Sequence, residues 1–257
     1  MRSKLAVVVG LMLTISAAAA DRSGCWANDY AGESINVRSA PSTTANILQS
    51  IPKEKTPSLV RVDASGSHSG DWLKVRGSQF EGWVSAREVV CRFSSQEAQE
   101  IIAKQADEVI LALKDANMQE LARSVHPVKG LRLSPYSVVD TKTDVVLTAS
   151  QVQGALQDPV KRVWGGNAGS GAPIRLTFVR YYHKFVYDRQ FAHAPQISYN
   201  RANKGTEQAW QDYPNAIVVD YRLPETSNVP QEDLRLAFEQ HEGKWYLSGI
   251  IHDGWTI

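Results

Sequence analysis

We single out five side chains of the later part of this sequence as candidates for acid–base chemistry or polar ligand contact: His126, His183, Tyr187, Asp188 and His252. A histidine–aspartate pair can move protons near neutral pH, because the imidazole pKa lies in that range. The histidines also have structural interpretations. His126 precedes a proline, where a histidine more often bonds the backbone at a helix end, and His183 falls in an aromatic run typical of a core. We expect these five residues to contact a ligand and predict no catalytic residue.

The spacing of the reactive side chains argues against the common catalytic centres. No His-x-x-x-His or Glu-x-x-His pair indicates a metal site, and no Gly-x-Ser-x-Gly segment indicates a serine nucleophile. We therefore predict no metal and no cofactor, and we favour a binding protein over an enzyme. The alternative is an enzyme with a pocket that acts on a small molecule by His/Asp acid–base chemistry, since the residues of such a site are scattered along the sequence.

The elements that must position these residues begin with a helix. Ser94 and Glu97 form a capping-box pattern before apolar residues that recur at helical spacing, and residues 118–125 predict a second, shorter helix. Strands are predicted at residues 174–187, 216–223, 233–240 and 244–252, with a hairpin turn at residues 242–243. Alternation along the first strand puts His183 and Tyr187 on one face. Two helices that lead into an antiparallel sheet indicate an α+β domain.

A different pattern precedes this segment. Asn36 and Arg38 alternate with apolar neighbours, so we expect their side chains to face solvent. Trp72 and Trp83 fall in two further short strands, and they have two interpretations: packing in the core of a small domain, or a stacking platform for a peptide or sugar. Short strands between regular turn signals predict a small all-β barrel.

The barrel segment, about residues 33–91, resembles a bacterial SH3 domain. The resemblance rests on Asn36-Val37-Arg38-Ser39-x-Pro41-Ser42, Trp72-x-x-Val75 and Gly82-Trp83-Val84, which occur in the right order. It implies a cell-envelope module of the kind that binds wall peptides and often accompanies peptidoglycan enzymes. The loop from Val62 to Asp71 is longer than such domains usually need.

The later segment resembles the cone-shaped fold shared by ketosteroid isomerase and nuclear transport factor 2. The residues concerned are Met118-x-x-Leu121-Ala122-x-x-Val125-His126 and Leu234-x-Leu236-x-Phe238-x-x-x-Glu242-Gly243-Lys244-Trp245-Tyr246-Leu247. This resemblance implies helices packed on a curved antiparallel sheet, as in cystatin-like cones, with one open mouth. Other short patterns in the segment are similar to an exported bacterial domain of unknown function.

The start of the chain predicts export. Arg2 and Lys4 precede an apolar run, and Ala18-Ala19-Ala20 suits a signal-peptidase site, so residues 1–20 are expected to be a cleaved signal peptide. The run is shorter than the roughly 20 residues of a membrane helix, and we predict no membrane span. Cys25 and Cys91 are the only cysteines, and in an exported chain such a pair is more often a disulfide than a metal site. We therefore expect a periplasmic or secreted protein.

Charge and length complete the prediction. Loss of Arg2 and Lys4 changes the formal net charge from +1 to −1, and the sequence contains no basic run, so we expect no nucleic-acid partner. The length suggests two domains, a barrel at residues 21–92 and an α+β domain at residues 93–257. We predict an exported envelope-binding protein in which the barrel holds a peptidoglycan peptide or an envelope protein, and the second domain recognises a further partner or dimerises.

Overall fold

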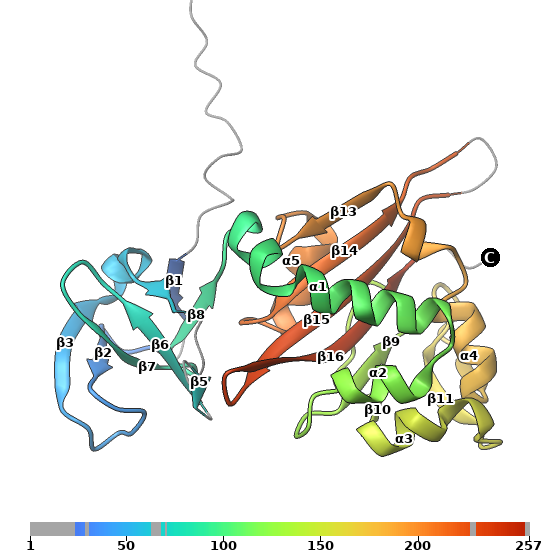
Figure 1. Ribbon diagram of the computed structural model, residues 1–257, viewed down its shortest axis with the longest axis horizontal. Coiled ribbons are helices and arrows are strands. Elements are labelled where there is room, and N and C mark those ends of the chain that lie inside the picture. The colour runs from blue at the N-terminus through green and yellow to red at the C-terminus, as the bar shows by residue number, and fades with distance from the viewer. Residues whose placement is uncertain (1–23, 29–30, 63–67, 70, 227–229, 255–257) are drawn as a thin grey trace, which may run out of the picture.

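The computed structural model describes residues 24–28, 31–62, 68–69, 71–226 and 230–254. The expected signal peptide at residues 1–20 lies outside the described residues. Two β-sheets dominate the structure, and they lie side by side with the long helix α1 (Ser95–Lys114) beginning between them (Figure 1). We call the described residues of 24–92 the N-terminal unit and those of 93–254 the C-terminal unit.

The N-terminal unit is built from short strands, as the sequence predicts. Its larger sheet has the order β3-β2-β7-β6-β4, and β5 also pairs with β6. The strands are β2 (Ser34–Arg38), β3 (Ile47–Pro52), β4 (Val60–Arg61), β5 (His68–Ser69), β6 (Trp72–Arg76) and β7 (Glu81–Ser85). A separate pair joins β1 (Gly24–Ala27) to β8 (Val89–Arg92), and a 3-10 helix, η2 (Lys53–Ser58), precedes β4.

Alternating side chains give this unit its own core. Ile35, Val37, Leu73, Val75 and Val84 are almost completely buried, and each alternates along its strand with a more exposed neighbour. The predicted disulfide is confirmed: Cys25 and Cys91 face one another across β1 and β8 and close a sequence separation of 66 residues. Such a loop closure removes about 4 kcal/mol of unfolded-state freedom in the chain-entropy model.

The C-terminal unit is organised around a six-stranded sheet of order β10-β9-β16-β15-β14-β13. In that order its strands are β10 (Val145–Leu147), β9 (Leu131–Ser134), β16 (Lys244–Asp253), β15 (Glu232–His241), β14 (Ile217–Leu223) and β13 (Gln196–Tyr199). The predicted hairpin turn is confirmed, because Glu242 and Gly243 both have positive φ and join β15 to β16. The expectation of a wholly antiparallel sheet is wrong, because β9 pairs with β16 in parallel.

Five α-helices occur in the described part of the chain, whereas the sequence pattern predicts one long helix and a second, shorter one. After α1 come α2 (Met118–Ser124), α3 (Ala149–Gly154), α4 (Phe178–Phe185) and α5 (Lys204–Asp212). Short 3-10 helices at Ala155–Gln157 and Phe191–His193 and the hairpin of β11 (Arg162–Gly166) with β12 (Pro173–Leu176) complete the unit. The capping box of α1 is confirmed: Ser94 accepts a bond from the Glu97 amide and Glu97 accepts one from the Ser94 amide. None of the described helices is long and apolar enough to cross a membrane.

Helices cover both faces of the large sheet. On one face, shown toward the viewer in Figure 1, α1 crosses the strands and packs with α2, α3 and α4 over the main core. Large aromatic side chains fill that core, including Trp164, Tyr181, Phe185, Tyr221 and Phe238. On the other face α5 covers a smaller cluster in which Trp210 and Tyr213 pack against Val218 and Ala237.

The predicted long strand at residues 174–187 is wrong. Its first residues form β12, and after Thr177 the chain becomes helix α4. Phe178, Tyr181, Tyr182 and Phe185 are buried, and their spacing of three and four residues places them on one side of the helix. The burial of these four rings in the main core stabilises the helix. His183 and Tyr187 therefore do not share the face of a strand.

Direct contacts join the two units. Arg61 of β4 is 5% exposed and donates to the carbonyl of Asn215 (2.7 Å) and to Oε1 of Gln240 (3.2 Å). Its guanidinium also lies 5.0 Å from the ring centroids of Phe93 and Trp245. The units thus share a buried cation, which joins β4 of the N-terminal unit to residues of β15, β16 and two loops of the C-terminal unit.

Candidate functional site

Four of the predicted ligand-contact residues come together on the outer side of the N-terminal sheet. Asn36 and Arg38 of β2, Trp72 of β6 and Trp83 of β7 are all partly exposed. Trp83 lies opposite Arg38 on one neighbouring strand and opposite Lys74 on the other. We call Asn36, Arg38, Trp72, Lys74 and Trp83 the tryptophan face.

The tryptophan face follows from the alternation of each strand. Leu73, Val75 and Val84 point into the core, so Trp72, Lys74 and Trp83 must point outward. The two indole rings therefore lie outside the buried core of the N-terminal unit. Their alternative interpretation, as core residues, would require them to lie inside it. Aromatic rings that are held by a sheet and open to solvent offer flat surfaces for stacking.

Positive charges flank these rings. Arg38 donates through Nη1 to the carbonyl of Ala45 at 2.8 Å, and its backbone lies opposite that of Trp83. Lys74 Nζ lies 2.6 Å from Oε1 of Glu81, and Arg76 bonds the other oxygen of the same carboxylate at 2.9 Å. Hydrogen bonds from Lys74 and Arg76 lower the pKa of Glu81. The tryptophan face thus carries one arginine and one lysine beside its two rings, and Arg76, in the same strand as Lys74, shares the Glu81 carboxylate with that lysine.

One end of the tryptophan face adjoins a hollow between the two units. The hollow has a volume of about 370 Å³, and its wall includes Asp71, Arg87, His126, Lys129, Glu239 and His241. Asp71 directly precedes Trp72 in the chain. Opposite charges are paired across its surface, Arg87 with Asp71 at 2.6 Å and Lys129 with Glu239 at 2.6 Å. The paired charges that line the hollow therefore largely balance.

His126 has the structural role that its position before a proline suggests. It is 3% exposed, and its Nδ1 accepts hydrogen bonds from the amides of Val128 (3.2 Å) and Lys129 (3.0 Å). Burial lowers the pKa of His126 to about 4, with Lys129 and His241 acting in the same direction. An imidazole in this state accepts bonds from the turn and is neutral at physiological pH.

Of the other predicted residues of the C-terminal unit, His183 and Tyr187 lie apart, whereas His252 and Asp188 contact each other. His183 is exposed on α4, so its interpretation as a core histidine is wrong. Tyr187 accepts a hydrogen bond from the Ala192 amide and packs edge-on against Phe191. His252 and Asp188, in contrast, come together: Nε2 of the fully buried imidazole lies 3.3 Å from Oδ2 of the carboxylate.

A third side chain, that of Glu232, lies next to this pair and was not predicted from the sequence. Ligand atoms of Asp188, Glu232 and His252 all lie within 4.8 Å of one another. Arg189 pairs with Oε2 of Glu232 at 2.9 Å. Burial raises the pKa of Glu232, and the neighbouring Asp188 raises it further. A signal was present in the sequence, because Glu232 is in phase with Leu234, which faces the core.

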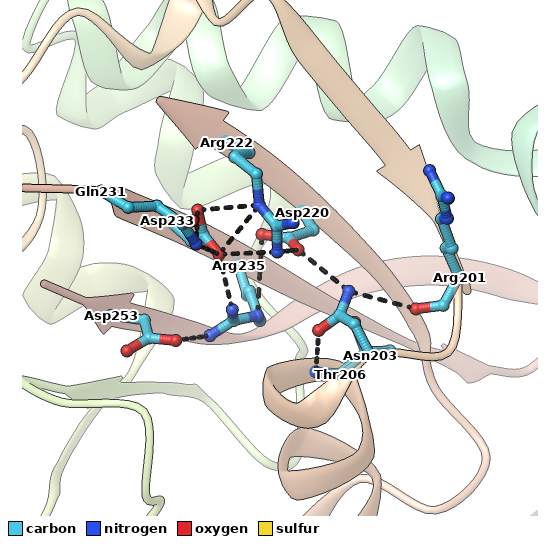
Figure 2. A network of polar contacts seen from close by, with 9 residues as sticks. All are labelled: Arg201, Asn203, Thr206, Asp220, Arg222, Gln231, Asp233, Arg235 and Asp253. Atoms are coloured by element: carbon cyan, nitrogen blue, oxygen red, sulfur yellow. Dashed lines mark hydrogen bonds and ion pairs between the residues drawn. The ribbon is translucent and has the colours of Figure 1, made fainter. Parts of the chain in front are cut away.

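A second charged cluster lies on the opposite face of the sheet, beneath α5 (Figure 2). Arg235 is 1% exposed and reaches Asp233 at 2.9 Å and Asp253 at 2.7 Å, and Asp233 also binds Arg222 at 3.0 Å. Burial raises the pKa of the remaining carboxylate, that of Asp220. These ion pairs satisfy charges between sheet and helix and serve the fold.

The comparisons with known proteins concern the N-terminal unit alone. No curated protein and no solved structure matches the chain. The family of bacterial SH3 domains matches residues 33–90, a range that contains every residue of the tryptophan face. This segment, with its short strands and outward-facing tryptophans, is similar to the bacterial SH3 domains.

Proposed function

We propose that this protein is an exported binding protein of the cell envelope and that the tryptophan face is its ligand surface. The observation that carries the proposal is the alignment of Trp72, Trp83 and Arg38 on the open side of the bacterial SH3 segment. The Cys25–Cys91 disulfide supports an oxidising compartment, the periplasm or the exterior. The apolar start of the sequence supports export.

The chemistry of the face favours a carboxylate-bearing ligand. Indole rings stack on flat amide or sugar surfaces, and arginine pairs with carboxylates in a fixed geometry. A peptidoglycan peptide has amide planes and free carboxylates, and we propose it as the ligand. An acidic segment of an envelope protein is the other partner of the same chemistry. We propose that the C-terminal unit is a cone-like α+β domain that serves as a second recognition or dimerising surface.

The test is co-sedimentation of the full, oxidised protein with purified peptidoglycan. We expect the protein to sediment with the polymer, and Trp83→Ala to weaken binding about tenfold, because one stacked ring contributes roughly 1–1.5 kcal/mol. Trp26→Ala is the matched control, since Trp26 is 40% exposed but lies on β1, away from the tryptophan face.

Two results would count against the proposal. If the oxidised wild-type protein stays in solution, peptidoglycan is not the ligand. If Trp83→Ala and wild type sediment equally while both remain folded, the tryptophan face is not the surface that binds. Loss of binding in Trp26→Ala alone would place the site on the other side of the unit.

A second candidate function is an enzyme that acts on a small molecule, and one contact favours it. His252 and Asp188 are within hydrogen-bonding distance, as a proton-transfer pair requires. Phe185 packs edge-on against the same imidazole at 5.9 Å, and the main core around it is filled by aromatic rings. We therefore place this function second to envelope binding.

A further inference from the structure

The group formed by Asp188, Glu232 and His252 has the composition of a metal centre. Asp188 follows α4, Glu232 begins β15 and His252 lies near the end of β16. One imidazole and two carboxylates each offer a ligand atom, and these three atoms lie within 4.8 Å of one another. Ligands that bind one ion at 2.0–2.2 Å in tetrahedral geometry are about 3.4 Å apart. The 3.3 Å separation of His252 Nε2 and Asp188 Oδ2 already matches this value.

The three side chains are much more buried than those of an ordinary surface cluster of charged residues. His252 is completely buried, and the side chains of Glu232 and Asp188 are 8% and 16% exposed. Oδ1 of Asp188 and Nδ1 of His252 have no hydrogen-bond partner among the described residues. A buried carboxylate oxygen without a donor is costly. A cation among the three side chains would offset that cost.

The charges of the group also favour an added cation. Two carboxylates face a single guanidinium, that of Arg189, and this contacts Glu232. Two carboxylates against one guanidinium give the group one formal negative charge in excess. Arg189 bonds Oε2 of Glu232, so the carboxylate can present its second oxygen to an ion, as a metal ligand held by an outer hydrogen bond does.

The backbone next to the group leaves room for these side chains only because residue 254 is glycine. A Cβ at Gly254 would lie 2.7 Å from Cγ of Glu232 and 2.9 Å from Cε1 of His252. Phe185 fixes the imidazole from another side by an edge-to-face contact. The two ligand side chains on the sheet are thus held by packing, which is the arrangement that a preorganised site needs.

We propose that Asp188, Glu232 and His252 bind one divalent transition-metal ion. Mixed imidazole and carboxylate ligands suit Zn²⁺ or Mn²⁺, whereas Ca²⁺ prefers six or more oxygen ligands. Coordination by three side chains leaves further positions on the ion for water or for a small molecule that the protein binds. The site lies in the C-terminal unit, so the proposal is independent of envelope binding by the tryptophan face.

The test is metal binding by the full, oxidised protein without an affinity tag. Calorimetric titration with Zn²⁺ and with Mn²⁺ is expected to show one ion per chain, and Co²⁺ is expected to give the visible absorption of a protein-bound ion. Asp188→Asn and His252→Gln are expected to weaken binding by about tenfold or more. His183→Gln is the matched control, because His183 is an exposed histidine of the same unit.

Asp188→Asn decides the matter if His252→Gln fails to fold, because Asp188 is the most exposed of the three side chains. Circular dichroism in chelator establishes that each variant is folded before titration. The proposal is overturned if wild type binds neither Zn²⁺ nor Mn²⁺ at about millimolar concentration. It is also overturned if folded Asp188→Asn binds as tightly as wild type, or if His183→Gln abolishes binding.

Discussion

Protonation of one buried imidazole, that of His126, connects the pH of the surroundings to the stability of the fold. Nδ1 of His126 accepts two backbone hydrogen bonds, and a proton on this atom would break both. The pKa of His126 is about 4 in the folded protein, against an ordinary value of 6.5. Between these values the unfolded chain binds the proton and the folded chain does not, so acid favours unfolding.

We therefore predict that His126 contributes to the loss of stability as pH falls from about 6.5 to 4, by about 1–3 kcal/mol. Its contribution is fully present above pH 6.5. His126→Asn keeps an acceptor for the two amides but does not titrate, so its stability should depend less on pH across this window. Denaturant unfolding at pH 7.5, 5.5 and 4.5 measures the difference. His183→Asn, at an exposed histidine, should follow wild type, and equal slopes for His126→Asn and wild type would contradict the assignment.

For single residues, the sequence indicated which side chains could belong to a site, but it did not indicate which of them lie next to one another. Asn36, Arg38, Trp72 and Trp83 could be grouped from alternation and motif order, because each strand is short and regular. Glu232 could not be joined to Asp188 and His252, because the contact depends on the register of β15 against β16 and on where α4 ends. Neither quantity is encoded in local spacing.

At the scale of elements, α4 shows why a helix can be mistaken for a strand in a sequence pattern. The run from residue 174 to 187 is rich in aromatic and β-branched residues, which favour strands. The buried rings of Phe178, Tyr181, Tyr182 and Phe185 nevertheless follow the helical period, and tertiary burial overrides the local preference. The capped helix α1 and the hairpin of β15 and β16 were predictable, because the side chains at their ends specify the backbone locally.

The docking of α5 on the sheet leads to a prediction at Gly205. A Cβ there would lie 2.1 Å from the guanidinium of Arg235, so the helix can approach the buried ion pairs only without a side chain at this position. Gly205→Ala should lower the free energy of unfolding by about 1–3 kcal/mol, although alanine is the better helix former. Gly154→Ala in α3 is the control, since a Cβ there meets nothing within 4 Å and should be neutral or mildly stabilising. Denaturant unfolding of both variants decides, and equal values for the two would contradict close docking.

At the scale of the whole molecule, the two units are joined by polar contacts between residues far apart in the sequence, and no local pattern predicts such contacts. Arg61 contacts Asn215 and Gln240, which are 154 and 179 residues away. Asn215 also accepts a hydrogen bond from the Cys91 amide at 2.8 Å. The bacterial SH3 segment was predictable from the order of its motifs. The arrangement of the two units was not predictable, because it depends on long-range contacts of single side chains.

We predict that Arg61 couples the unfolding of the two units. Arg61→Met keeps the length of the side chain but removes two charge-assisted hydrogen bonds, and it should cost about 2 kcal/mol or more. Calorimetry should then show two transitions where the wild-type protein shows one. Arg76→Met is the matched control, because the side chain of Arg76 is 65% exposed and, among the described residues, it pairs with Glu81 of the same sheet alone. A single unshifted transition in Arg61→Met would show that other contacts hold the units together.

The position of the disulfide gives this joint a dependence on redox conditions. Cys91 bonds Asn215 through its amide, and the next residue, Arg92, places its guanidinium 4.1 Å from the ring centroid of Trp210. The covalent bridge therefore anchors the very strand from which the chain passes into α1. A thiol reductant that cleaves this one bond in the N-terminal unit is therefore expected to loosen the strand that leads into the C-terminal unit.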